Sequence, residues 1–231
     1  MNKLLEFKNY LKALGYSENT IKAYTRDIKP YVNGNLDEFI KSLANLKENS
    51  RYRKVCALKK FLAFRNENIN LPKVKFINNP RRYKLVSYNE VLNAIRRIEN
   101  KQVKFILLLM LKLGLRVSEA ISVKKEDFVD NYLIVKGKGG YEYKLLVDDE
   151  IKELIDDYKS ISRISVYRWC KKFLNLYPHN LRALFITEIA KKDLNIARIL
   201  ARHKNIQTTT RYIIPDENRI KGILKEVWKG K

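Results

Sequence analysis

The residues best suited to chemistry lie in two short segments in the second half of the chain. The sequence holds only two histidines, His179 and His203. His179 stands three residues before Arg182 in "HNLR", and His203 stands nine residues before Tyr212 in "RHKNIQTTTRY". Taken singly, each of these residues is more often structural, since histidines cap helices and the chain contains 14 tyrosines. As a set, they offer an imidazole for proton transfer, a guanidinium for anion binding and a phenol for nucleophilic attack.

Two further cations complete a set that suits the transfer of a phosphodiester to a tyrosine. Arg116 lies in "LGLRVSEA", and Lys138 lies in the glycine-rich "KGKGG". Arg116 and Arg182 are predicted to clamp the nonbridging oxygens of the phosphate, whose negative charge grows in the transition state. Losing one such preorganised donor costs about 3 kcal/mol. His203 is predicted to hydrogen-bond the same phosphate.

Proton transfer decides the remaining roles. A phenol has an ordinary pKa of about 10, so Tyr212 needs a base to accept its proton, and His179 is the candidate. The departing deoxyribose oxygen is far more basic and needs a proton donor. Lys138 is preferred for that role because it lies between glycines at the tip of a predicted hairpin, while Lys136 and Lys144 remain alternatives.

The chain carries a large excess of positive charge. Lys and Arg outnumber Asp and Glu by 48 to 25 in 231 residues, a formal charge of +23. This excess favours a polyanion as partner, and we expect double-stranded DNA. A membrane surface is the rival, but the longest apolar run, residues 105–111, is too short to span a bilayer, and the N-terminus lacks the apolar core of a signal peptide. We therefore expect a cytoplasmic protein that does not bind a membrane.

The two cysteines give no sign of a metal or a disulfide. Cys56 and Cys170 lie far apart in the sequence and in no metal-ligand spacing. We therefore expect two buried, reduced thiols and no cofactor.

The first third of the chain is predicted to be a set of helices followed by a basic connector. Gly15 is a natural helix stop, and Ser17 is a natural cap for the next helix. In "RYRKVCALKKFLAF", Val55, Leu58 and Leu62 share one side of a helix whose opposite side is cationic. Between residues 41 and 84, thirteen Lys or Arg stand against two acids. The predicted DNA-binding residues are Arg51, Arg53, Lys54, Lys60, Lys73, Lys75, Arg81 and Arg82.

The rest of the chain combines helices with one small sheet. "SYNE", from Ser87, has the pattern of a capping box and predicts a helix start. Residues 131–147 alternate apolar and polar positions around a glycine-rich centre, which predicts a β-hairpin. The chain beyond residue 148 is predicted to be helical, and its last helix has an apolar stripe at Ile220, Ile223, Leu224 and Val227. The expected fold is mainly α with a small β-sheet, divided into a helical domain (1–70), a basic linker (71–84) and a catalytic domain with a C-terminal helix (85–231).

These motifs resemble those of the tyrosine site-specific recombinases, the group of lambda integrase and the Xer proteins. "LGLRVSEAISVKKEDF" is similar to the family's first box, with an acid, Glu119, three residues after the arginine. "HNLRALFITEIA" resembles the His-x-x-Arg box, "RHKNIQTTTRYI" the His-then-Tyr box, and "GYSENTIKAYTRDI" part of the core-binding domain. The resemblance implies a SAM-like helical core-binding domain followed by the α+β catalytic domain of the family. Richness in Lys, Ile and Asn favours a small mobile element or an AT-rich, archaeal genome.

The resemblance also implies a mechanism. Tyr212 would form a 3′-phosphotyrosyl bond with DNA and free a 5′-hydroxyl, which attacks the partner strand through a Holliday junction. Neither ATP nor a metal would be required, because the phosphoester is exchanged rather than hydrolysed. Four protomers would assemble on two specific sites, each closing its two domains around the duplex. The C-terminal helix would pack either into a neighbouring protomer or on its own domain.

The sequence also departs from the family pattern. Ala183 stands where many relatives have a second histidine, Ala201-Arg202 replaces the usual Leu-Gly before the histidine of the last box, and the segment between residues 138 and 179 is shorter than in most relatives. Two alternative functions stay open. A relaxase similar to type IB topoisomerases would use the same residues, and an accessory protein would bind DNA without cutting it.

Overall fold

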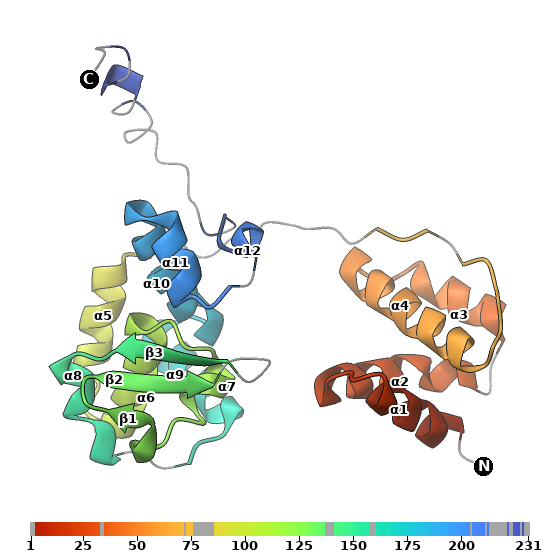
Figure 1. Cartoon of the computed structure of the whole chain (residues 1–231), viewed down its shortest axis with the longest axis horizontal. Helices are drawn as coiled ribbons and strands as arrows, with labels where there is room; N and C mark the ends of the chain where they lie inside the picture. Colours follow the sequence, from red (N-terminus) through yellow and green to blue (C-terminus); the bar gives the residue numbers. More distant parts are fainter. Residues whose placement is uncertain are drawn as a thin grey trace. The chain divides into compact units, whose positions relative to one another are not determined.

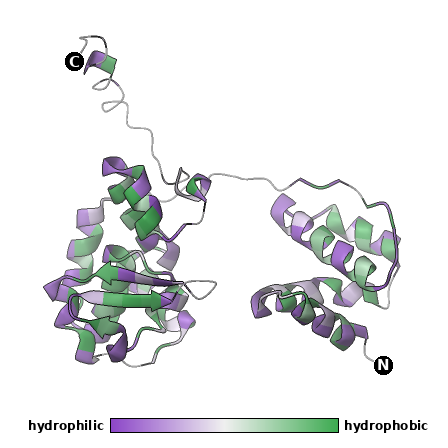
Figure 2. Cartoon of the chain, viewed as in Figure 1, coloured by the Kyte–Doolittle hydropathy of each residue, from purple (hydrophilic) through white to green (hydrophobic). Residues whose placement is uncertain are grey.

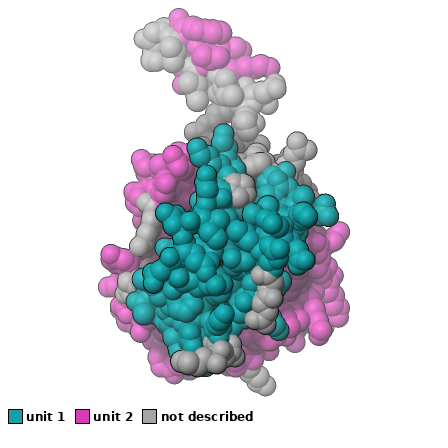
Figure 3. Space-filling model, turned by 90° about the vertical axis from the view of Figure 1, so that its right-hand side faces the viewer, with its two compact units in different colours: residues 1–79 teal, residues 80–231 magenta. Residues whose placement is uncertain are grey.

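The computed structural model of the chain consists of two compact units, residues 1–79 and residues 80–231, which Figure 3 colours separately. It describes residues 3–32, 35–71, 73–75, 86–136, 141–157, 160–203, 205–210, 212, 221, 224–226 and 228. Each unit has its own hydrophobic core. Most of the predicted linker, residues 71–84, lies outside the described residues, and the predicted domain limits stay a prediction.

Unit 1 is helical (Figure 1), and aromatic side chains pack in its core. Phe7 and Phe61 are fully buried and meet edge to face, with ring centroids 5.0 Å apart. The predicted stop and start around residue 16 are confirmed, because Gly15 has a φ of +73° and Ser17 Oγ accepts the backbone N–H of Thr20 at 3.3 Å. The described helices of this unit are α1 (Lys3–Ala13), α2 (Glu18–Val32), α3 (Leu36–Leu43) and α4 (Glu48–Phe64).

The predicted apolar side of α4 is confirmed, since Val55, Leu58 and Leu62 are all buried in the unit 1 core. A bidentate ion pair joins α4 to α2. Arg53 Nε lies 2.6 Å from Asp27 Oδ2, its second nitrogen lies 3.1 Å from Oδ1, and Asp27 is 4% exposed. Such a paired fork satisfies a carboxylate that would otherwise be costly to bury.

Unit 2 combines helices with a three-stranded antiparallel sheet in the order β1-β2-β3. The predicted hairpin is confirmed by β2 and β3, in which Tyr132 pairs with Leu146 and Lys136 pairs with Glu142. The mainly α fold with a small sheet is therefore confirmed. The described elements are α5 (Tyr88–Arg96), α6 (Lys101–Lys112), α7 (Val117–Ala120), η1 (Lys125–Asp127), β1 (Phe128–Val129), β2 (Tyr132–Lys136), β3 (Glu142–Leu146), α8 (Asp149–Lys152), η2 (Ile155–Asp157), α9 (Arg163–Leu174), α10 (Pro178–Lys192), α11 (Leu194–Leu200) and α12 (Ile206–Thr210).

Helix α6 forms the centre of the unit 2 core. Its sequence, "KQVKFILLLMLK", is apolar on most sides, and the seven residues from 105 to 111 are all buried. The apolar residues of this helix are coloured as hydrophobic in Figure 2, as are parts of β2 and β3. Because α6 is surrounded on all sides, it fixes the positions of the elements that carry the candidate residues.

Two sequence predictions need correction or fall outside the described residues. A helix does start after Ser87, as predicted. The Ser87 side chain makes no capping hydrogen bond, so the predicted capping box is wrong. Of the predicted apolar stripe near the C-terminus, Ile220, Ile223 and Val227 lie outside the described residues, while Leu224 is 40% exposed. Among the described helices, none has the length and apolar character needed to cross a membrane.

We predict that Gly114→Ala destabilises unit 2. Gly114 has a φ of +60°, and an added Cβ would overlap the ring of Phe185. The left-handed backbone costs about 1–2 kcal/mol for a residue with a Cβ, and overpacking adds about 1–3 kcal/mol. Native-state hydrogen exchange measures the loss in each unit separately.

Gly15→Ala is the matched control for the overlap between the added Cβ at position 114 and the ring of Phe185. Gly15 has a φ of +73°, but an added Cβ meets nothing within 4 Å, so only the backbone cost is expected. Equal losses from the two substitutions would contradict the packing role assigned to Phe185.

Candidate active site

The starts of several helices meet at one open pocket of about 290 Å³ in unit 2. Arg163 begins α9, while Pro178 and His179 begin α10, and all three line the pocket. The N-terminus of a helix presents backbone N–H groups and a partial positive charge, which favours anions. The residues that line the pocket are Met110, Leu115, Arg116, Val117, Ser118, Arg163, Tyr167, Pro178, His179 and Arg182. The pocket is therefore suited to a negatively charged group.

Arg116 lies at the edge of this pocket, immediately before α7. Its backbone N–H donates to Glu119 Oε2 at 2.8 Å, and its guanidinium donates to Oε1 at 2.6 Å. The Arg116 side chain is 45% exposed, whereas that of Glu119 is only 11% exposed. The acid three residues later therefore holds the arginine at the pocket edge while leaving it open to solvent.

Arg182 is almost completely buried, with 2% of its surface exposed. Its two terminal nitrogens donate to the carbonyls of Gly114 and Ala201, and one of them also lies 3.2 Å from His203 Nε2. Burial first, and then the charges of Arg116 and Arg202, lower the pKa of Arg182 to about 10. The side chain thus stays charged at neutral pH and is fixed in place by two other segments, one at Gly114 and one at residues 201–203.

His203 has a defined tautomer. An arginine N–H only donates, so His203 Nε2 must accept from Arg182, and Nδ1 then carries the proton. Nδ1 donates to Thr209 Oγ1 at 2.9 Å, from the buried side of α12. Burial first, then Arg182, Arg116, Arg202 and His179, lower the pKa of His203 to about 4. The imidazole is therefore neutral at physiological pH.

Tyr212 lies directly against both histidines and is only 5% exposed. Its hydroxyl is 3.3 Å from His179 Nε2, and its ring stacks on His203 with centroids 6.0 Å apart and planes inclined by 20°. Its backbone N–H donates to the Thr209 carbonyl at 3.0 Å, and its own carbonyl accepts from Thr187 Oγ1 at 3.2 Å. The phenol is thus placed next to the imidazole predicted as its base.

The structure brings together five of the six predicted catalytic residues, since Arg116, His179, Arg182, His203 and Tyr212 form one connected group. Lys138 lies outside the described residues. Of its alternatives, Lys136 lies 4.0 Å from Glu142 across the hairpin, and Lys144 is exposed on β3. The identity of the proton donor stays a prediction.

The predicted DNA-binding residues divide into four groups. Arg51 donates to the carbonyls of Leu43, Ala44 and Leu46, and Arg53 pairs with Asp27, so both guanidiniums have structural partners. Two others lie near rings, Lys54 about 6.0 Å from Phe39 and Lys60 about 5.9 Å from Tyr16. Lys73 and Lys75 are exposed, and Arg81 and Arg82 lie outside the described residues.

Sequence reasoning missed three contributors to the site. Arg202 is buried and donates to Glu119 Oε2 at 2.7 Å, Thr209 orients His203, and Arg163 lines the pocket. The only signal in the sequence was that Arg202 departs from the family pattern.

Burial would raise the pKa of Glu119, but Arg202 and then Arg116 outweigh it and lower that pKa. Glu119 is therefore a carboxylate shared by two arginines.

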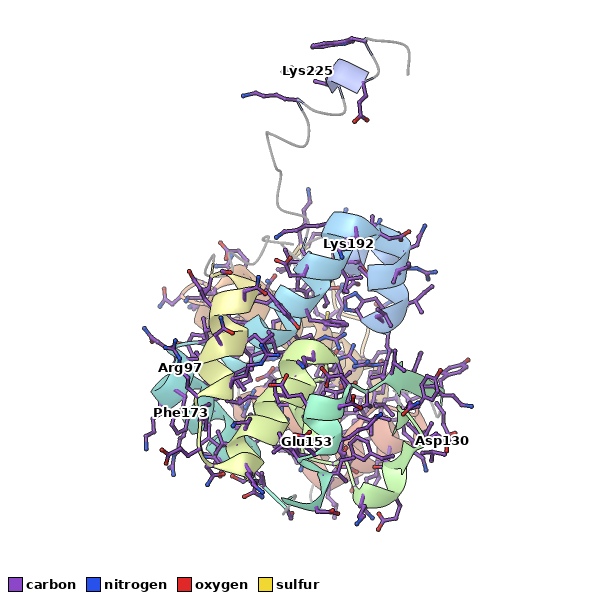
Figure 4. The ribbon with its side chains drawn as sticks, turned by 90° about the vertical axis from the view of Figure 1, so that its left-hand side faces the viewer. Arg97, Asp130, Glu153, Phe173, Lys192 and Lys225 are labelled. Carbon is purple, nitrogen blue, oxygen red and sulfur yellow. The ribbon has the colours of Figure 1, made fainter. Side chains whose placement is uncertain are left out.

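A second described pocket of unit 2 lies away from the candidate site. Arg97, after α5, and Phe173, on α9, lie near each other on the face shown in Figure 4, where they line a pocket of about 410 Å³. That pocket includes none of the predicted site residues. No group of three or more metal-ligating side chains occurs among the residues that the structure describes. Cys170 is buried, and burial raises the pKa of its thiol to about 12.

We predict that His203 makes the stability of unit 2 depend on pH. Its pKa of about 4 lies below the ordinary value of 6.5, so between these values the unfolded chain binds more protons and stability falls as pH falls. His203→Gln removes this titration. The stability difference between the wild type and His203→Gln, measured by urea unfolding, should therefore shrink from pH 7 to pH 5. A constant or growing difference would contradict the buried neutral imidazole.

Comparisons with known proteins found relatives that match most of the chain. A scan against models of protein families gave no match. The chain is 26% identical to the TnP I resolvase of Bacillus thuringiensis, over 96% of this chain and 98% of that protein. It is 29% identical to the tyrosine recombinase XerA of Pyrococcus horikoshii, over 90% of this chain and 87% of that protein.

Solved structures of the same group share the fold. Lambda integrase, in a tetramer bound to a Holliday junction, matches with a TM-score of 0.72 and 19% identity over 92% of this chain and 76% of that chain. The site-specific recombinase XerH, in a pre-cleavage complex with its difH substrate, matches with a TM-score of 0.67 and 16% identity over 90% and 79% of the two chains. With the arginines, histidines and tyrosine gathered at one site, these likenesses support a tyrosine recombinase family member.

Proposed function

We propose that this chain is a site-specific DNA recombinase that cuts and rejoins strands through Tyr212. The observation that carries the proposal is the contact between the Tyr212 hydroxyl and His179 Nε2, at 3.3 Å, in a group that also contains Arg116 and Arg182. A phenol beside an imidazole nitrogen and two cations suits attack on a phosphodiester. The likeness to DNA-bound XerH and lambda integrase supports DNA as the substrate.

In the proposed first step, the Tyr212 oxygen forms a bond to phosphorus while the bond from phosphorus to the 5′-oxygen breaks. The phenol proton moves to His179 Nε2, and the leaving oxygen takes a proton from Lys138. Arg116 and Arg182 stabilise the charge that develops on the nonbridging oxygens. His203 is neutral and accepts from Arg182, so its contribution to the phosphate in this geometry is to hold Arg182 in place.

The second step reverses the first with a different strand. The free 5′-hydroxyl of the partner strand attacks phosphorus and gives its proton to the neutral amine of Lys138, while the Tyr212 oxygen leaves and takes back a proton from His179. The number of phosphoester bonds is unchanged, so the reaction needs no ATP. Side chains of the protein supply the acid, the base and the charge stabilisation, so we propose that the reaction also needs no metal.

Recombination of two sites requires several copies of the chain on DNA. A tetramer on a Holliday junction is described for lambda integrase, and we extend that assembly to this protein. The C-terminal segment, with Leu224 and Trp228 exposed, is proposed to pack into a neighbouring protomer. A cytoplasmic location stays a prediction.

We predict that Tyr212→Phe binds duplex DNA but forms no covalent adduct. The substitution removes only the nucleophilic oxygen, while the ring stacked on His203 is retained. The substrate is a pool of nicked, random-sequence duplexes, in which the cut strand is lost after cleavage and the adduct is trapped. Adducts that resist detergent are recovered and sequenced, which also identifies the preferred site.

The same experiment separates the alternatives. An adduct that persists in Tyr212→Phe would place the nucleophile elsewhere. A wild-type protein that binds DNA but forms no adduct would be an accessory binding protein. Relaxation of supercoiled plasmids at many sites, with no recombinant product from two recovered sites, would indicate a topoisomerase-like relaxase.

We predict that the basic residues after α4 bind the DNA backbone. Lys73 and Lys75 are exposed, so Lys73→Ala/Lys75→Ala should weaken duplex binding. Each lost phosphate contact reduces the slope of log K against log salt by about 0.9, so the pair should reduce it by about 1.8. Fluorescence anisotropy over a series of salt concentrations measures this slope.

Lys124→Ala/Lys125→Ala is the matched control, since it removes two exposed lysines from unit 2, outside the predicted basic segment. It should leave the slope nearly unchanged. If both double variants change the slope equally, binding depends on overall charge and the assignment of the segment is wrong.

A further inference from the structure

Arg202 occupies an unfavourable position for an arginine. Its φ is +55°, in the left-handed region that favours glycine. Its side chain is 2% exposed, and within the described residues its Nε is buried without a hydrogen-bond partner. A strained backbone, a buried charge and an unsatisfied N–H all oppose folding. The contacts that the side chain makes must offset these costs.

The remaining contacts of Arg202 lead to both arginines of the proposed phosphate clamp. Its Nη2 donates to Glu119 Oε2 at 2.7 Å, and Glu119 Oε1 in turn holds Arg116 at 2.6 Å. The same nitrogen lies 3.3 Å from the Gly114 carbonyl, which also accepts from Arg182. One guanidinium thus shares an acceptor with each of the two clamp residues.

These contacts also join segments far apart in the sequence. Arg202 directly precedes His203, whose ring stacks on Tyr212, and its contacts reach 83 and 88 residues back to Glu119 and Gly114. Its Nη1 donates to the Leu200 carbonyl at 3.1 Å, which fixes the side chain to the end of α11. The buried ion pair between Arg202 and Glu119 therefore holds the segment that carries His203 next to the segment that carries Arg116.

We propose that Arg202 is a positioning residue that aligns Arg116, through Glu119, and Arg182, through the Gly114 carbonyl, on the scissile phosphate. This inference rests on the proposed strand-cleavage function. Arg202 does not line the pocket, so it acts through its neighbours rather than on the substrate. Its loss should slow the chemical step and leave duplex binding nearly intact.

The test compares cleavage of two substrates by Arg202→Met at saturating protein. One is the nicked duplex recovered with the wild type, and the other carries a neutral methylphosphonate at the scissile position. On the ordinary duplex, loss of a supporting partner should slow adduct formation about 10- to 100-fold. On the neutral substrate less charge develops, so alignment of the arginines matters less and the difference from the wild type should shrink to a few-fold.

Three further variants make the test specific. Arg116→Met should show the same dependence on substrate charge, because it removes the residue through which Arg202 is proposed to act. Arg198→Met, which removes a cation from α11 four residues earlier, should match the wild type on both substrates. Arg202→Gly accepts the φ of +55° without strain, so it keeps the test valid if Arg202→Met folds poorly.

The outcomes are distinguishable. Equal slowing of Arg202→Met and Arg202→Gly on both substrates would indicate general damage to the site and overturn the proposal. Wild-type rates in both variants would overturn it as well. Absence of an adduct with the wild type on either substrate would instead refute the proposed function.

Discussion

The burial of Arg182 is the constraint on which the candidate site depends. A guanidinium with 2% exposure must find acceptors for its N–H groups, because the cost of leaving them unpaired exceeds the gain from most single contacts. It finds them at Gly114, Ala201 and His203, which lie before α7 and after α11. Satisfying one side chain of α10 therefore fixes the approach of two other segments. The positive charge remains, and it lies beside the pocket where the helices begin.

The two histidines have different roles because their surroundings differ. His203 is enclosed by cations and by Thr209, so it stays neutral and serves as an acceptor and a stacking surface. His179 lies in the first turn of α10, lines the pocket and contacts the phenol of Tyr212. Two residues of the same type thus take different roles because one faces buried guanidiniums and the other faces the pocket.

Much of the fold could be predicted from the sequence because the patterns were local. Alternation over residues 131–147 predicted the hairpin, and the spacing of Val55, Leu58 and Leu62 predicted the buried side of α4. The candidate residues could be found because histidine is rare here and the motif spacings are specific. The sequence does not show which cations have partners within the fold. From the sequence, Arg51 and Arg53 both look like exposed surface charges. In the structure, Arg51 donates to carbonyls at the end of α3, and Arg53 forms an ion pair with the buried Asp27.

Arg202 illustrates the same limit at the site itself. Nothing near it in the sequence supplies its partners, since Glu119 and Gly114 are 83 and 88 residues away. Its left-handed backbone also contradicts the ordinary preference of a residue with a Cβ. Sequence patterns over a few residues do not predict the conformation of Arg202, because contacts with distant residues determine it. Such exceptions are common at functional sites.

The burial of the Tyr212 phenol has a consequence for the fate of the proposed intermediate. An ester formed on this residue, which is only 5% exposed, would meet little water. Shelter of this kind prevents hydrolysis of reactive intermediates. The energy of the broken phosphodiester bond would then be conserved until another hydroxyl arrives, and the DNA would not be left with an unsealed end.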